Sequence, residues 1–187
     1  EDSLLLDGPV AFTNVLYCLA VACARETFPE TQDWPVATPD AVLDLVLEPG
    51  KIGGVDTVSL AMVALWGRRM GVGEEGMARV DASLREAYGK ITPGQAVPNH
   101  SRIVPRNRIF FPLRVIGQGA YHAEWRWAWV GCLFASALAR RGMVHEARAC
   151  LGVYARAVRA YGTLHEVYES SCMVPVSRGL YRSEERF

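Results

Sequence analysis

Residues 121–162 read YHAEWRWAWVGCLFASALARRGMVHEARACLGVYARAVRAYG and contain two successive helical patterns on either side of Gly142. In the second pattern, apolar residues recur at spacings of three and four, which predicts one buried helical face. These residues are Ala147, Cys150, Leu151, Tyr154 and Val158. Because glycine permits a tight turn, the helices expected over 121–142 and 143–162 are predicted to form an antiparallel hairpin.

Four further helical patterns precede this hairpin, over residues 8–28, 38–50, 55–71 and 74–90. In the first of them apolar residues extend nearly all the way round, which is typical of a helix buried on most faces. The second begins with Thr38 and Pro39, which suit the N-cap and the first helical position. We therefore expect an all-α fold of about six helices, paired as three antiparallel hairpins.

The middle of the chain, residues 91–120, departs from this pattern. It contains Pro93, Pro98, Pro105 and Pro112, a density of proline that excludes a continuous helix. The stretch RIFFPLRVIG within it predicts a short strand or an extended pass. A proline-rich loop this long in a compact domain usually has a function or encloses a site.

The composition limits the possible partners. The chain has 187 residues, half of them apolar, and a formal net charge of zero, which fits one domain with a substantial core. Nucleic acids and membrane surfaces select a basic excess, so neither is an expected partner. The longest apolar candidate, VLYCLAVACA, is too short to span a membrane. Five cysteines without a CxxC motif fit reduced thiols in a cytoplasmic protein.

Several kinds of site are not indicated. The four histidines show no zinc-ligand spacing with one another or with cysteine, so no metal is expected. The glycines of GVGEEG lie between two helical patterns rather than after a strand, and no GxSxG motif occurs. The sequence therefore indicates no cofactor.

The densest group of aromatic residues is at the start of the helix expected over 121–142. It comprises Tyr121, His122, Trp125, Trp127 and Trp129. Trp125 and Trp129 are four residues apart and are predicted to share a helix face, with Trp127 on the other side. Flat indoles beside polar groups suit the C–H faces of sugar rings. The alternative is that the tryptophans fill a helix interface.

A carboxylate is expected close to this group. Glu166 lies in GTLHEVYE, on a loop that begins where Gly162 ends the preceding helix. In an antiparallel hairpin the end of one helix lies beside the start of the other, which places Glu166 near residues 121–125. A carboxylate in a partly dry aromatic cleft can serve as a general base. The alternative is a solvated charge.

Glu184, in YRSEERF, is a second candidate carboxylate. Arg182 and Arg186 flank it, so an ion pair would also explain it.

Four motifs in the C-terminal part resemble those of the six-hairpin glycosidases. They are YHAEWRWAWVG, RGMVHEA, GTLHEVYE and YRSEERF. This superfamily of (α/α)6 toroids includes glucoamylases, trehalases, neutral invertases, processing α-glucosidases and glycogen-debranching α-1,6-glucosidases. The resemblance covers roughly residues 109–187, and the earlier hairpins are similar only in being apolar and paired.

The resemblance implies roles for individual residues. Glu166 matches the general base, Tyr168 the tyrosine beside it, and Trp125 and Trp127 the aromatic wall of a sugar subsite. Tyr121, His122 and Glu184 complete the expected substrate-binding set.

No upstream residue matches the paired general acid of these enzymes. Asp2 and Asp7 fit no acid motif. We therefore interpret residues 1–187 as a single, partial toroid domain, the C-terminal portion of a longer protein whose remainder is its expected partner. The implied activity is inverting hydrolysis of an α-glucoside or related oligosaccharide, without a cofactor.

Two alternatives stay open at this point. A sugar isomerase or epimerase on a similar toroid would use His122 and His165 for proton transfer. A noncatalytic helical module would bury all three tryptophans, whereas the hydrolase requires Glu166 to line a hollow with Trp125 or Trp127.

Overall fold

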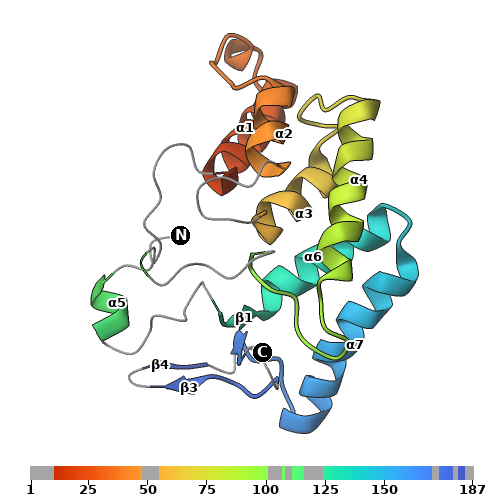
Figure 1. The fold of residues 1–187 in the computed structure, drawn as a ribbon. Helices are drawn as coiled ribbons and strands as arrows, with labels where there is room; N and C mark the ends of the chain where they lie inside the picture. The colour runs from red at the N-terminus through yellow and green to blue at the C-terminus, as the bar shows by residue number, and fades with distance from the viewer. Residues whose placement is uncertain are drawn as a thin grey trace.

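The computed structural model describes residues 11–47, 55–100, 107, 111–115, 124–169, 173–178 and 181–183. Within these residues, six α-helices of nine residues or more form most of the molecule (Figure 1). The helical character of the expected all-α fold is therefore confirmed, whereas two short antiparallel strand pairs depart from it. They are α1 (Ala11–Thr27), α2 (Pro39–Leu47), α3 (Thr57–Trp66), α4 (Glu74–Gly89), α6 (Ala128–Arg140) and α7 (Val144–Tyr161). Two shorter elements are the 3-10 helix η1 (Pro29–Thr31) and α5 (Phe111–Val115).

Helix α3 lies at the centre of the core. Residues 57–64 are all buried, and the helix packs against α1, α4 and α6. Its sequence is apolar on every side, which is the pattern of a helix surrounded by protein. Asp56 begins it, because the carboxylate accepts hydrogen bonds from the backbone N–H groups of Val58 at 3.3 Å and Ser59 at 3.1 Å.

Successive helices pack as the pairs α1–α2, α3–α4 and α6–α7, as expected from the sequence. Helix α6 contacts α3 on one side and α7 on the other, so that α1 and α2 lie at one end of the molecule and α7 at the other (Figure 1). Gly142 and Gly162, with φ of +81° and +79°, form the predicted turns after α6 and α7. The described helices show no closed ring of hairpins.

Two predicted helix faces are less buried than expected. In α1 only Val15, Cys18 and Val21 are buried, so the helix has one buried face rather than several. In α7, Leu151 and Val158 are exposed although their spacing predicted burial. Among the described elements, α1 packs against α2, α3 and η1, and α7 packs against α6, so these neighbours cover only part of each helix surface.

The start of the tryptophan-rich helix was predicted wrongly. The helix begins at Ala128 rather than near residue 121, and the residues before it form strand β1 (Arg126–Trp127). This strand pairs antiparallel with β2 (Val167–Tyr168), with Trp127 opposite Val167. Cross-strand pairing holds the backbone extended there, and tryptophan is well suited to a strand.

The proline-rich middle also differs from the expectation of a strand or extended pass. Residues 111–115 form the single-turn helix α5. Pro112 is compatible with this helix because it lies in the first turn, where no intrahelical N–H donor is needed. The remaining strands, β3 (Ser177–Arg178) and β4 (Tyr181–Arg182), form a second antiparallel pair.

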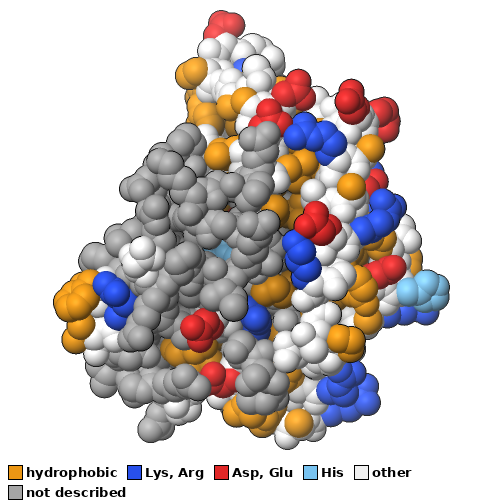
Figure 2. Space-filling view, in the orientation of Figure 1, with side chains coloured by type: hydrophobic (Ala, Val, Ile, Leu, Met, Phe, Trp, Pro, Cys, Tyr) orange, Lys and Arg blue, Asp and Glu red, His pale blue; other side chains and the backbone are white. Residues whose placement is uncertain are grey.

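The surface and the thiols match the composition. Acidic and basic side chains are interspersed over the helices at the right of Figure 2, as the balanced charge predicts. The described cysteines, Cys18, Cys23, Cys132 and Cys150, are free, while Cys172 lies outside the described residues. In the described part of the chain, no helix has both the length and the apolar character needed to cross a membrane.

Candidate functional site

The backbone of Glu166 lies at the amino end of α6. Its carbonyl oxygen accepts a hydrogen bond of 2.9 Å from the N–H of Ala128, the first residue of that helix. The strands β1 and β2 continue this contact from Trp127 and Val167 onward. The hairpin therefore brings Glu166 beside the end of the tryptophan-rich segment, at residues 126–128.

Ser183 fixes the chain on both sides of Glu166. Its hydroxyl oxygen accepts a hydrogen bond from the N–H of Val167 at 2.9 Å, and its carbonyl oxygen lies 3.3 Å from Nδ1 of His165. Ser183 is itself held, because its N–H donates to the carbonyl of Val176 at 2.7 Å. Glu166 is half-buried between the buried residues His165 and Val167. Its carboxylate is thus carried by a backbone fixed at both neighbours.

Tyr168 supports the same loop from inside. Its side chain is fully buried, and its hydroxyl accepts a hydrogen bond of 2.9 Å from the N–H of His165. Burial raises the pKa of Tyr168, so the phenol stays neutral. The ring of His165 packs edge-on against Tyr161 and Tyr168, with centroids 5.9 and 6.2 Å apart. These contacts give Tyr168 a role in holding the loop, and its direct contact with substrate stays a prediction.

The tryptophans are divided between core and surface. Trp125 and Trp127 are buried in the main core, whereas Trp129 on α6 is 47% exposed. Trp125 and Trp129 do not share a helix face, because Trp125 precedes the helix. The burial of all three indoles, which a noncatalytic module predicts, is found for Trp125 and Trp127 but not for Trp129. Contact of Trp125 or Trp127 with a sugar stays a prediction.

Three of the predicted site residues, Tyr121, His122 and Glu184, lie outside the described residues.

A loop from the proline-rich region contacts the elements that carry the site, as a loop of this length often does, although the sequence analysis named none of its residues. The N–H of Val97 donates to the hydroxyl of Tyr154 at 3.3 Å, and Nδ2 of Asn99 donates to the carbonyl of Trp125 at 3.2 Å. Burial raises the pKa of Tyr154, so it acts as a neutral hydrogen-bonding group. The sequence showed Tyr154 on a buried face, but its partner is distant in the chain.

A positive charge also lies near the site. Arg126 pairs with Tyr168 across the strands and is half-buried, which lowers the pKa of its guanidinium. The sequence analysis did not single out this residue. Among the described residues, no three His, Cys, Asp or Glu side chains gather as a metal site would require.

Comparison with family models, curated proteins and solved structures gives no match for this chain. The described features that bear on chemistry are the half-buried Glu166, the contacts of Ser183 with His165 and Val167 on either side of it, and the neighbouring Arg126.

Proposed function

We propose that this chain is part of an inverting glycoside hydrolase of the six-hairpin type, in which Glu166 is the general base. The substrate is an α-glucoside or a related oligosaccharide. One observation carries the proposal: the residues on both sides of Glu166 are held by Ser183, while the Glu166 side chain is only half-buried. A base that must orient a water molecule needs this combination of a fixed backbone and access to solvent.

The chemistry assigns Glu166 a defined task. Its carboxylate removes a proton from water as the oxygen attacks the anomeric carbon on the face opposite the leaving group. The general acid has to lie roughly 6.5–9.5 Å away so that the water fits between the two carboxyl groups. We assign the acid to the remainder of the polypeptide, whose further hairpins would complete an (α/α)6 toroid with the three found here.

Tyr168 and Ser183 are positioning residues in this proposal. They hold His165 and Val167, and through them the backbone of Glu166. Tyr121, His122, Trp125, Trp127 and Glu184 stay the proposed substrate-binding residues.

A noncatalytic helical module is the second candidate. The observation that favours it is the burial of Trp125 and Trp127, which are 1% and 6% exposed. Indoles packed in this way stabilise a helical core and do not require a ligand.

The test uses α-D-glucosyl fluoride, because fluoride leaves without protonation and an absent general acid then does not mask the base. We expect the 187-residue chain to release fluoride and to form β-glucose first, as proton NMR would show. Glu166→Gln should lower the rate by about 10²–10⁴-fold. The matched variant Glu169→Gln, three residues along the chain, should keep the wild-type rate.

Other results would favour other functions. A wild-type rate in Glu166→Gln would exclude Glu166 as the base. Turnover of free glucose or mannose that His165→Ala abolishes would indicate an isomerase. Absence of fluoride release from the wild-type chain, together with no heat of binding for maltotriose, would favour the noncatalytic module as the function of the chain.

A further inference from the structure

A separate cavity opens between α1, α2 and the turn that follows α3. Helices α1 and α2 lie at the other end of the molecule from β1 (Figure 1), the strand beside which Glu166 lies. Its volume is about 350 Å³, within the range of roughly 300–1,000 Å³ usual for small-molecule sites. Its deepest residues, Cys18, Val21, Val42 and Val72, are at most 5% exposed. The floor of the cavity is therefore apolar.

The mouth of this cavity is polar. Arg25 and Arg69 reach it from α1 and from the turn after α3, together with Glu26. Arg69 forms a two-pronged ion pair with Glu26, with one N–O distance of 2.6 Å. Arg25 donates to the carbonyl of Trp34 at 2.8 Å. Two guanidinium groups and one carboxylate leave the mouth with a net positive charge.

The wall opposite α1 depends on a glycine. Gly71 has φ of +89°, a conformation that side chains disfavour, and a Cβ there would lie 3.2 Å from Cγ of Pro39. This close approach brings the turn of residues 69–72 against the start of α2. The cavity is thus built from three segments that are distant in the sequence, and packing holds all three.

Cys18 at the floor does not act as a nucleophile. Its side chain is 5% exposed, and burial raises the pKa of the thiol, so that the neutral form prevails. The cavity therefore suits reversible binding rather than covalent capture.

We propose that this cavity binds an amphipathic anion, with an aliphatic body on the apolar floor and a carboxylate beside Arg25 and Arg69. The apolar floor selects for a hydrocarbon chain, because hydrocarbon removed from water is stabilised in proportion to the area buried. The net positive charge of the mouth selects for an anionic head, which would accept charge-assisted hydrogen bonds from the N–H groups of Arg25 and Arg69 that do not bond Trp34 or Glu26. The proposal is independent of the glycosidase function.

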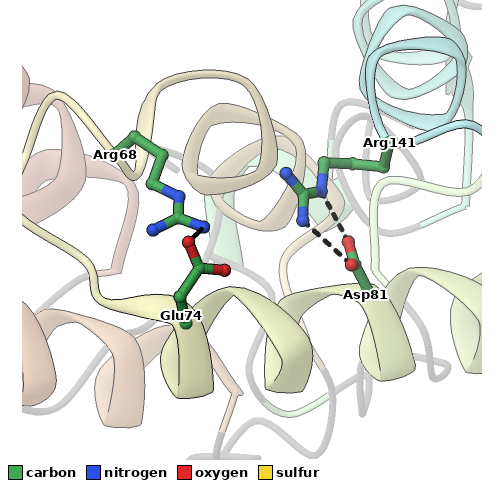
Figure 3. A network of polar contacts seen from close by, with 4 residues as sticks. All are labelled: Arg68, Glu74, Asp81 and Arg141. Carbon is green, nitrogen blue, oxygen red and sulfur yellow. Dashed lines mark hydrogen bonds and ion pairs between the residues drawn. The ribbon is translucent and has the colours of Figure 1, made fainter.

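The test measures octanoate and octanol binding to the full chain by isothermal titration calorimetry. We expect octanoate to bind at least tenfold more tightly than octanol, which has the same chain without the charge. Arg69→Gln should weaken octanoate binding at least fivefold. Its neighbour Arg68 provides the control, because Arg68 pairs with Glu74 and does not line the cavity (Figure 3). Arg68→Gln should leave the affinity unchanged.

A second pair of variants tests the space in the cavity rather than its charge. Ala22 lines the cavity and Ala20 is exposed on the same helix. Ala22→Phe should abolish octanoate binding, whereas Ala20→Phe should preserve it, and circular dichroism checks that both fold. Equal affinity for octanol and octanoate, wild-type binding by Arg69→Gln or Ala22→Phe, or no octanoate binding at all would each overturn the proposal. Glu166→Gln should bind octanoate normally.

Discussion

The backbone of Gly131 on α6 packs directly against the phenol ring of Tyr154 on α7. A Cβ atom at position 131 would overlap the hydroxyl and the ring carbon that bears it. Tyr154 in turn is 3% exposed and accepts the hydrogen bond from Val97. The absence of a side chain at position 131 therefore sets the spacing of the α6–α7 hairpin and the position of the loop behind the candidate site.

Replacing this glycine should destabilise the protein. We expect Gly131→Ala to lower the free energy of unfolding by about 1–3 kcal/mol, since the added methyl overpacks the core. Gly152 in α7 is the matched control, because a Cβ there meets only Nη1 of Arg156 at 3.7 Å. Gly152→Ala should raise the free energy of unfolding by roughly 0.5–1 kcal/mol through helix propensity. Urea unfolding measures the free energy of unfolding of both variants. Equal changes in Gly131→Ala and Gly152→Ala would contradict the packing argument.

The ion pair between Arg141 and Asp81 should contribute more stability than the one between Arg68 and Glu74. Arg141 donates to both carboxylate oxygens of Asp81, at 2.6 and 2.9 Å, and the side chains are 23% and 21% exposed (Figure 3). Arg68 and Glu74 are 49% and 86% exposed, so water screens their attraction. We expect Arg141→Gln to cost about 1 kcal/mol and Arg68→Gln less than about 0.5 kcal/mol.

Thermal unfolding at low and high salt further distinguishes the contributions of the two ion pairs to stability. Because Arg141 also joins the end of α6 to α4, its loss should lower the melting temperature at both salt concentrations. A larger loss for Arg68→Gln would show that solvent exposure does not rank these pairs.

His100 should make stability depend on pH in the mildly acidic range. It forms a β-bridge with Asp56 at the start of α3. Burial lowers its pKa, and the attraction of Asp56 only partly offsets this. The unfolded chain therefore binds a proton at His100 more readily than the folded chain. The stability that neutral His100 contributes is therefore fully present above the pKa of the unfolded state, about 6.5. It is lost as the pH falls toward the lower pKa of His100 in the folded state.

The measurement is the free energy of unfolding between about pH 8 and about pH 5.5, a window chosen to lie above most carboxylate titrations. The wild type should lose stability through this window. His100→Gln should lose less, because it removes one of the protonation sites. Parallel pH profiles for the two proteins would contradict the assignment to His100.

The helices were predictable from the sequence because their signals are local. Gly142 and Gly162 marked two turns correctly, and the apolar spacing of Ala147, Cys150 and Tyr154 identified the buried face of α7. Leu151 fits the same spacing, but it is exposed because no described helix covers that side. Periodicity shows which residues could be buried together, whereas the number of neighbours decides how wide the buried face is.

The details of the candidate site were less predictable because its contacts are distant in the chain. Because residues 126–127 pair with residues 167–168, α6 begins later in the chain than the helical pattern of the sequence predicted. It was foreseen that the hairpin would bring Glu166 near the tryptophan-rich segment. The sequence had no local signal that Ser183 and Tyr168 would hold the loop between them, since each bond joins side chain to backbone across a turn or a strand pair.

The hydroxyl of Ser183 should position Glu166, and this can be tested separately from folding. Ser183→Ala removes the acceptor for the N–H of Val167, while Ser183→Thr retains it. We expect the alanine variant to exchange the Val167 amide proton at least tenfold faster, because an unbonded amide opens more easily, and the threonine variant to restore protection. If Glu166 is the base, Ser183→Ala should also lower kcat for α-D-glucosyl fluoride with little change in KM, since a misplaced base weakens only the transition state. Faster exchange with an unchanged kcat would show that the hydrogen bond from Val167 to Ser183 stabilises the loop but has no role in catalysis. Unchanged exchange at Val167 would show that the hydrogen bond does not hold the loop.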